Sequence, residues 1–195
     1  MTAFRKTQVA LTSKAAPFAI RAERAADVAT REALLDASFG ENRHDRTCQR
    51  LRDGRAPAAG LALAAVHEGT LVGTVRLWHV SAGGRPALVL GPLAVDPACR
   101  ELGIGAALMQ QALAAARARG HAAVILLGDA PYYARFGFSA EKTGALMLPG
   151  PFERDRLLAV EFQAGALDGA EGMIVPTGAA LPKRRVVRAL QAHAA

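Results

Sequence analysis

Short apolar runs and periodic apolar positions divide the first third of the chain into a strand and helices. An extended run over residues 18–21 predicts a strand. Asp27 is a good N-cap for a helix that carries the apolar positions from Val28 to Phe39. A weaker helix is expected around residues 46–52, before a loop that reaches Gly60.

Three strands are expected in succession after this loop. Residues 61–67 and 71–80 flank a Glu68-Gly69 turn, and residues 87–95 follow a turn at 81–84. Such short connections join antiparallel neighbours.

The pattern then changes to helices alternating with buried strands. An alanine-rich helix is expected over roughly Gly103 to Arg119, and the short apolar strand 122–127 is typical of one that follows a crossover helix. A helical turn begins at Pro131, and residues 156–162 form the final predicted strand. These elements predict an α/β (α+β) domain with a mixed, mostly antiparallel sheet flanked by helices.

The domain organisation follows from where this periodicity begins and ends. Residues 1–16 lack it and are expected to form a flexible N-terminal leader, and residues 17–164 hold the domain. Residues 165–195 are rich in glycine and end in a basic tail, so they are interpreted as a C-terminal extension.

Composition narrows the class of protein. The 195 residues are enough for one core, and no apolar run approaches the roughly 20 residues of a membrane-spanning helix. Two cysteines are too few for a disulfide framework, and with no export signal the expected compartment is the cytoplasm. The net charge of +7 suits a polyphosphate ligand as well as nucleic acid. Because no basic run alternates with aromatics, nucleic-acid binding is not favoured, and the basic run 183–188 is interpreted as solvated.

The chemistry is concentrated between Leu90 and Ala106. Proline donates no hydrogen bond and glycine permits a bulge, so Gly91-Pro92 should open the sheet. The backbone of residues 93–95 is then free to pair with an extended, amide-rich ligand arm. The next helix begins with Arg100-Glu101-Leu102-Gly103-Ile104-Gly105-Ala106. Its first N–H groups lack partners and its glycines let an anion approach, which predicts a phosphate site.

This segment, Arg-x-x-Gly-x-Gly-Ala after a bulged strand, resembles the pyrophosphate-binding motif of the GCN5-related N-acetyltransferases (GNAT). A second segment, residues 128–138, resembles the family's second cofactor motif, in which a tyrosine precedes a Gly-Phe pair by four residues. The sequence of this second segment, together with Pro149-Gly150-Pro151 and Gly165-Ala166-Leu167, is similar to the sequences of the bacterial YhbS-like subgroup. The resemblance covers roughly residues 18–162.

The resemblance implies the GNAT fold, with central strands splayed to hold acetyl-CoA, and acetyl transfer from this cosubstrate to an amine, without a metal. It implies that Tyr133 protonates the departing thiolate. Asp129 stands near the place of an asparagine that often contacts pantetheine, a departure from the family pattern. The implied cofactor-binding residues are Leu93, Ala94, Val95, Arg100, Glu101, Leu102, Gly103, Ile104, Gly105, Ala106, Asp129, Tyr132, Tyr133 and Phe136.

The general base and the acceptor stay open. Many family members carry a glutamate on the strand before the phosphate loop, but residues 87–95 contain no carboxylate. Water is one alternative, and the candidate side chains are Glu41, His44, Asp45 and His79. Cys99, beside the loop, is interpreted as incidental.

Two further questions follow from the sequence. Met147, Leu148 and Phe152 are candidates for an acceptor surface or a homodimer interface, and core packing explains them equally well. The acceptor is a small-molecule or protein amine. The alternative function is a non-catalytic acetyl-CoA sensor or interaction module.

Overall fold

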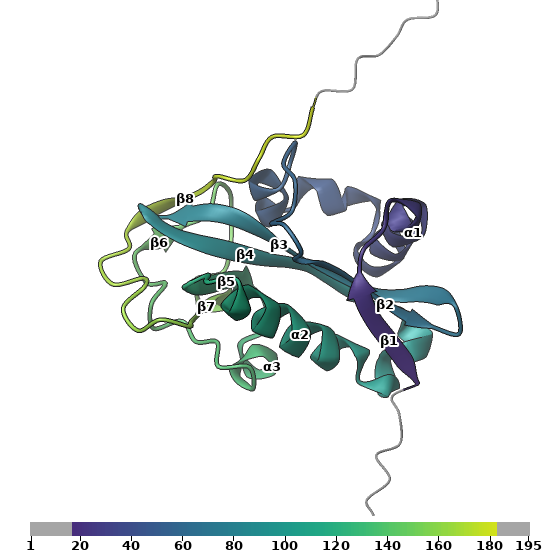
Figure 1. Cartoon of the computed structure of the whole chain (residues 1–195). Helices are drawn as coiled ribbons and strands as arrows, with labels where there is room; N and C mark the ends of the chain where they lie inside the picture. Colours follow the sequence, from purple (N-terminus) through teal and green to yellow (C-terminus); the bar gives the residue numbers. More distant parts are fainter. Residues whose placement is uncertain (1–16, 183–195) are drawn as a thin grey trace, which may run out of the picture.

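The computed structural model describes residues 17–182, and a mixed sheet runs through this part of the chain (Figure 1). Its strand order is β1-β2-β3-β4-β5-β7, and a further strand, β8, pairs with β3 and with the short β6. Pairing is antiparallel except between β4 and β5 and between β6 and β8. The strands are β1 (Phe18–Ala22), β2 (Ala62–His67), β3 (Thr70–Ala82), β4 (Arg85–Val95), β5 (Ala123–Leu127), β6 (Leu146–Met147), β7 (Leu157–Glu161) and β8 (Gly172–Pro176).

Helices lie on both sides of the sheet, with α1 (Val28–Phe39) on one side and α2 (Ile104–Ala118) on the other (Figure 1). A single turn of helix, α3 (Ala130–Ala134), follows β5. The class predicted from the sequence is therefore confirmed. The 3-10 helices are η1 (Ala25–Asp27), η2 (Glu41–Asp45), η3 (Thr47–Leu51), η4 (Pro97–Leu102) and η5 (Arg154–Arg156).

Alternation along the strands builds a core on each face of the sheet. On β3, Val75 and Leu77 join the cluster that contains Ile104 and Leu108 of α2. On the opposite face of the same strand, the side chains from Trp78 onwards pack in a second cluster with Leu51, Leu146 and Leu157. This is the period-two pattern of a strand buried on both faces.

Helix α2 approaches the sheet closely at Gly73. A Cβ there would lie 2.9 Å from Ile104 Cγ2 and 3.0 Å from Leu108 Cδ1. The absent side chain lets the start of α2 pack directly on β3, next to the opening of the sheet.

Three expectations for local structure were wrong. The helix expected around residues 46–52 is instead the 3-10 helix η3 (Thr47–Leu51), which the extended residue Arg46 (φ −66°, ψ 141°) separates from η2. The carboxylate of Asp27 does not cap α1; it accepts from the Arg24 N–H at 2.7 Å and pairs with Arg21. Strand β7 is not the last, since β8 follows it.

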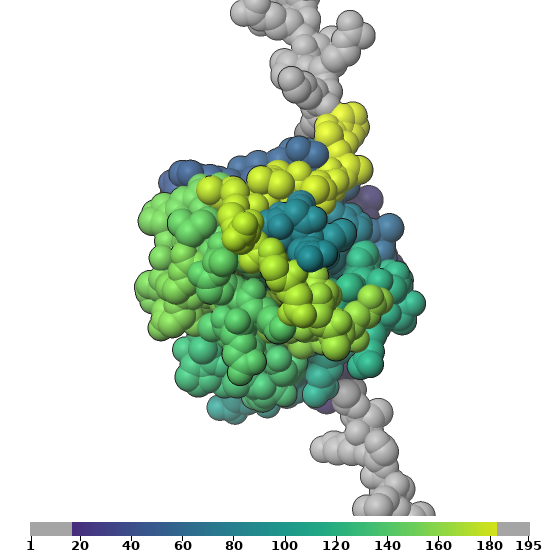
Figure 2. Space-filling model, turned by 90° about the vertical axis from the view of Figure 1, so that its left-hand side faces the viewer, coloured from purple at the N-terminus to yellow at the C-terminus, as the bar shows by residue number. Residues whose placement is uncertain are grey.

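The segment after residue 164, expected as an extension, adds β8 to the sheet. Leu167, Ala170 and Ile174 are buried in the second cluster. Figure 2 shows this part of the chain crossing one face of the molecule beside the end of β3. The expected leader and the basic tail from Lys183 lie outside the described residues. Within residues 17–182, no helix is both long enough and apolar enough to cross a membrane.

Candidate functional site

The sheet opens between β4 and β5, as Gly91-Pro92 predicts. The two strands pair only at Leu88 with Val124 and at Val89 with Ile125. Toward its C-terminal end, β4 carries a bulge where the register against β3 shifts, and its residues 93–95 then pair with β3 alone. The other edge of this segment faces open space, as an extended ligand arm requires.

A groove of about 530 Å³, here called the helix groove, runs from this free edge to the start of α2. The first helical hydrogen bond of α2 is from the Ala107 N–H to Gly103 O (3.1 Å), which leaves the N–H groups of Ile104, Gly105 and Ala106 without helical acceptors. The residues that line the helix groove are Ser38, Phe39, Leu93, Ala94, Val95, Arg100, Glu101, Gly103, Gly105, Ala106, Tyr132 and Arg135.

The lining of the helix groove fits a polyphosphate with an amide arm. Free N–H groups at a helix start attract anions, and Arg100 and Arg135 add positive charge. Arg135 stacks on Tyr132, 4.2 Å from the ring centroid. The hydroxyl of Ser38 is buried without a hydrogen-bond partner among the described residues, so a polar ligand in the groove would satisfy it.

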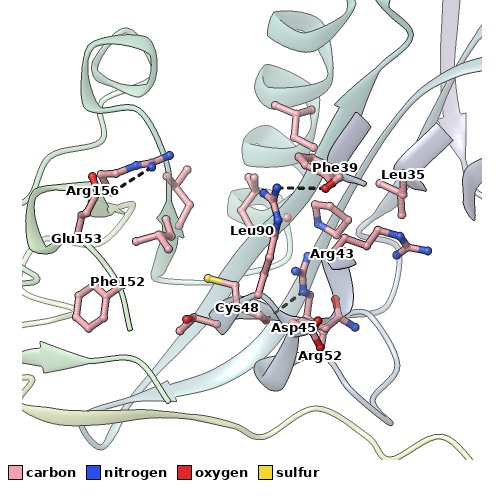
Figure 3. Close-up of a pocket in the computed structure, with 18 of the residues that line it drawn as sticks. Leu35, Phe39, Arg43, Asp45, Cys48, Arg52, Leu90, Phe152, Glu153 and Arg156 are labelled. Carbon is pink, nitrogen blue, oxygen red and sulfur yellow. Dashed lines mark hydrogen bonds and ion pairs between the residues drawn. The ribbon is translucent and has the colours of Figure 1, made fainter. Parts of the chain in front are cut away.

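A second cavity of about 500 Å³, here called the arginine pocket, is lined in part by the bulge of β4. Figure 3 shows several of its lining side chains. One wall comes from the end of α1 and from η2 and η3, and the opposite wall from residues 151–156. Its lining residues are Leu35, Phe39, Arg43, Asp45, Arg46, Thr47, Cys48, Gln49, Arg52, Leu90, Gly91, Pro92, Leu93, Leu126, Leu127, Tyr133, Pro151, Phe152, Glu153 and Arg156.

The helix groove and the arginine pocket meet at Phe39 and Leu93, which line both. Tyr133 lines the arginine pocket, while its neighbour Tyr132 lines the helix groove. The two tyrosine rings contact each other edge to face, with centroids 4.9 Å apart. A reacting group delivered along the groove would therefore meet a second molecule beside Tyr133.

Close packing holds the ring of Tyr133. A Cβ on Gly128 would lie 2.2 Å from Tyr133 Cε2, so only glycine leaves room for the ring. Burial raises the pKa of Tyr133 to about 12, and the nearby Tyr132 and Asp129 add to this rise. The phenol therefore stays protonated at neutral pH and can act as a proton donor.

Most of the residues implied for the cofactor lie together in the helix groove. Four do not line either cavity. Ile104 is buried in the core and Phe136 packs against it, while Leu102 is exposed. Asp129 caps α3, where its carboxylate accepts from the Tyr132 N–H at 3.2 Å.

Among the candidate bases, only Asp45 lines the arginine pocket. Glu41 and His44 are exposed outside the pocket lining, and His79 contacts His121 with ring centroids 5.3 Å apart. Of the three apolar candidates, Phe152 lines the pocket, Leu148 is buried in the core and Met147 is 43% exposed. Cys99 is buried in the core.

Sequence reasoning did not single out several lining residues. Arg135 lies within the second cofactor motif, residues 128–138, so the sequence could have identified it. Ser38, Phe39, Arg52, Glu153 and Arg156 have no such signal, because only the fold brings their segments together.

The fold and the two adjoining cavities are typical of an acetyltransferase, and comparison with known proteins gives the family. The chain matches the model of the acetyltransferase (GNAT) family over residues 28–138, more than half of its length. It belongs to the GNAT family.

Particular relatives are also recognisable. The chain is 31% identical over 157 residues to the uncharacterized N-acetyltransferase YhbS of Escherichia coli K12, covering 80% of this chain and 93% of YhbS. The crystal structure of E. coli YhbS in complex with CoA matches with a TM-score of 0.72 and 29% identity, covering 85% of this chain and 93% of that one. A GNAT family acetyltransferase from Brucella melitensis in complex with acetyl-CoA matches with a TM-score of 0.55 and 29% identity, covering 77% and 98%.

Proposed function

We propose that this protein transfers the acetyl group of acetyl-CoA to a primary amine. The observation that carries the proposal is the meeting of the helix groove and the arginine pocket at Leu93, beside Tyr133. The groove suits a nucleotide with a long amide arm, and the pocket is the size of a small-molecule site.

Binding of the cosubstrate is assigned to the helix groove. The pyrophosphate would be held by the N–H groups of Ile104, Gly105 and Ala106 and by Arg100. The free edge of residues 93–95 would pair with the pantetheine amides and point the thioester toward the arginine pocket. YhbS, bound to CoA in its crystal structure, supports this assignment by its similarity.

The reaction needs a neutral amine, a stabilised oxyanion and a proton for sulfur. The amine nitrogen attacks the thioester carbonyl, and collapse of the tetrahedral intermediate breaks the C–S bond. Tyr133 donates its phenolic proton to the leaving sulfur, the nitrogen releases a proton to solvent, and the Tyr133 phenolate regains a proton from solvent. Backbone N–H groups at the free edge of β4 would stabilise the oxyanion.

The lining of the arginine pocket helps to supply the neutral amine. Within residues 17–182, Arg52 of this lining has no carboxylate partner, so its positive charge is not neutralised by an ion pair. Positive surroundings disfavour an ammonium ion and so lower the pKa of a bound amine. No carboxylate on β4 is then required, which agrees with its absence from residues 87–95.

A non-catalytic sensor needs no amine-sized pocket beside the thioester, so the arginine pocket favours transfer over that alternative. The test is release of CoA thiol from acetyl-CoA in a screen of primary amines. Tyr133→Phe should reduce kcat by about 100-fold, a typical contribution of a positioned acid. Its affinity for CoA, measured by calorimetry, should stay unchanged. Full turnover by this variant would remove the acid role from Tyr133.

A further inference from the structure

Arg52 reaches into the arginine pocket from the end of η3. Its Nε donates to the Cys48 carbonyl oxygen at 3.1 Å. Its Nη1 lies 3.7 Å from the place that a Cβ on Gly91 would occupy, so the guanidinium reaches the bulge of β4. Arg52 therefore presents its charge close to the junction with the helix groove.

No carboxylate neutralises this guanidinium in the described part of the chain. Asp53, next in sequence, accepts from Gln49 Nε2 at 2.6 Å. Within residues 17–182, none of the ion pairs includes Arg52. Its bond to the Cys48 carbonyl occupies one donor only, whereas a guanidinium offers five.

The other arginines of the pocket are engaged. Arg43 pairs with Glu32 and with Asp36. Arg156 lies 3.8 Å from Glu153 on the opposite wall (Figure 3). Arg46 donates to the Phe39 carbonyl oxygen at 3.3 Å and stacks over that ring. Arg52 is thus the guanidinium of this lining that lacks both a carboxylate and an aromatic partner among the described residues.

A half-buried guanidinium without a counterion is electrostatically unfavourable, so Arg52 should attract an anion. Burial lowers the pKa of Arg52, and the positive charges of Arg43 and Arg46 lower it further, against opposing effects of Cys48 and Asp53. An arginine held this way gains most from a planar or tetrahedral oxyanion that accepts two of its N–H groups.

We propose that Arg52 binds an anionic group, a carboxylate or a phosphate, on the amine that accepts the acetyl group. This inference rests on the proposed acetyl transfer and narrows its substrate to small primary amines that carry an acidic group. With the anion at Arg52, the amine at the other end of the molecule lies toward Leu93 and Tyr133, which line the same pocket.

Matched pairs of amines test this specificity. Beta-alanine is compared with its neutral amide, L-amino acids with their amides, and phosphoethanolamine with ethanolamine, by release of CoA thiol. In the wild-type protein the anionic member of the preferred pair should have a kcat/KM at least about 10-fold higher, as one charged hydrogen bond provides. The carboxylate and phosphate pairs show which oxyanion Arg52 takes.

Three variants assign the preference to Arg52. Arg52→Gln should bring the two members of the pair to equal kcat/KM, and Arg52→Lys, which keeps the charge but loses the planar fork, should retain part of the preference. The control is Arg117→Gln on the exposed side of α2, which removes one positive charge outside both cavities and should keep the full preference. Circular dichroism verifies that each variant is folded.

The failure of this inference is distinguishable from the failure of the proposed function. Acetylation of neutral amines as fast as anionic ones, or an unchanged preference in Arg52→Gln, overturns the role of Arg52 while acetyl transfer stands. If no amine is acetylated, acetyl transfer fails, and calorimetric titration of beta-alanine and phosphoethanolamine into the CoA-bound protein decides the anion site. Binding that weakens in Arg52→Gln supports the site. Equal binding by the variant and the wild type, or no binding by the wild type, overturns it.

Discussion

Trp78 donates its indole N–H to the carbonyl oxygen of Gly91 at 2.7 Å. The donor lies on β3, is 6% exposed, and is the single tryptophan of the chain. Its acceptor lies in the bulge of β4, where the regular ladder to β3 is interrupted. The side chain thus supplies a hydrogen bond that the backbone of β3 does not, and it holds the strand in its bent course.

Replacing Trp78 with Phe should destabilise the fold and weaken the site together. The variant loses this hydrogen bond and part of a buried ring, which predicts a loss of about 1 to 3 kcal/mol in the free energy of unfolding. Urea unfolding followed by circular dichroism measures it, since tryptophan fluorescence is lost. Affinity for CoA should also fall because residues 93–95 follow the bulge directly. If the variant kept the stability and CoA affinity of the wild type, the bulge would not depend on this hydrogen bond.

Replacing Gly128 with Ala should displace the proposed acid without touching the helix groove. The new methyl would lie 2.2 Å from Tyr133 Cε2, so the ring must move. We expect kcat to fall at least about 10-fold, as a positioned acid is lost, while CoA affinity is preserved. The matched control is Gly144→Ala, which meets no atom within 4 Å. Equal kcat in the two variants would contradict the placement of Tyr133.

The ionisation of Tyr133 can be observed directly, because the chain has only two tyrosines. In Tyr132→Phe, an ultraviolet titration of phenolate formation reports Tyr133 alone. Its pKa, raised to about 12 in the native protein, should stay above the usual value of about 10, because burial is the main cause of the shift. The unfolded chain releases this proton first, so stability should fall as the pH rises above about 10. A Tyr133 pKa of about 10, in a sample that circular dichroism shows to be folded, would argue against burial of the phenol.

Replacing Gly105 with Val should weaken cofactor binding sharply. The branched side chain would stand among the free N–H groups at the start of α2, where Tyr132 Oη and Val95 Cγ2 already lie 3.3 and 3.6 Å from a Cβ. Because it blocks close approach of phosphate to these groups, we expect a loss of CoA affinity of at least about 10-fold. Ala114→Val, exposed on the same helix, controls for the helix propensity of valine. Equal CoA affinity in the two variants would exclude this end of α2 from the phosphate site.

The parts of the fold that were predictable are those whose signal is local. The strands from residue 61 to residue 95 are apolar runs separated by turns at residues 68–69 and 81–84, and the start of α2 is marked by Gly103 and Gly105. The helix groove is built largely from this one stretch, so sequence alone could identify most of its lining. Strand β8 was missed because its glycine-rich surroundings resemble a loop, and its pairing with β3 joins segments about 95 residues apart.

The arginine pocket depends on long-range packing in the same way. Arg52, Gly91 and Glu153 come from three distant segments, and none of them belongs to a motif with a fixed spacing. Their common location follows only from the side of the sheet on which η3 and the 151–156 loop pack. The motif resemblance was therefore enough to suggest the cosubstrate, while the proposal for the acceptor needed the three-dimensional arrangement of these segments.

Phe39, the last residue of α1, borders two compartments at once. Any reactant that shifts this ring changes the volume left for the other, so the affinities of the two reactants are linked. Thermodynamic linkage requires the effect to be reciprocal and of equal size. A reactant that displaced this ring would therefore change the affinity of the neighbouring compartment for the other reactant.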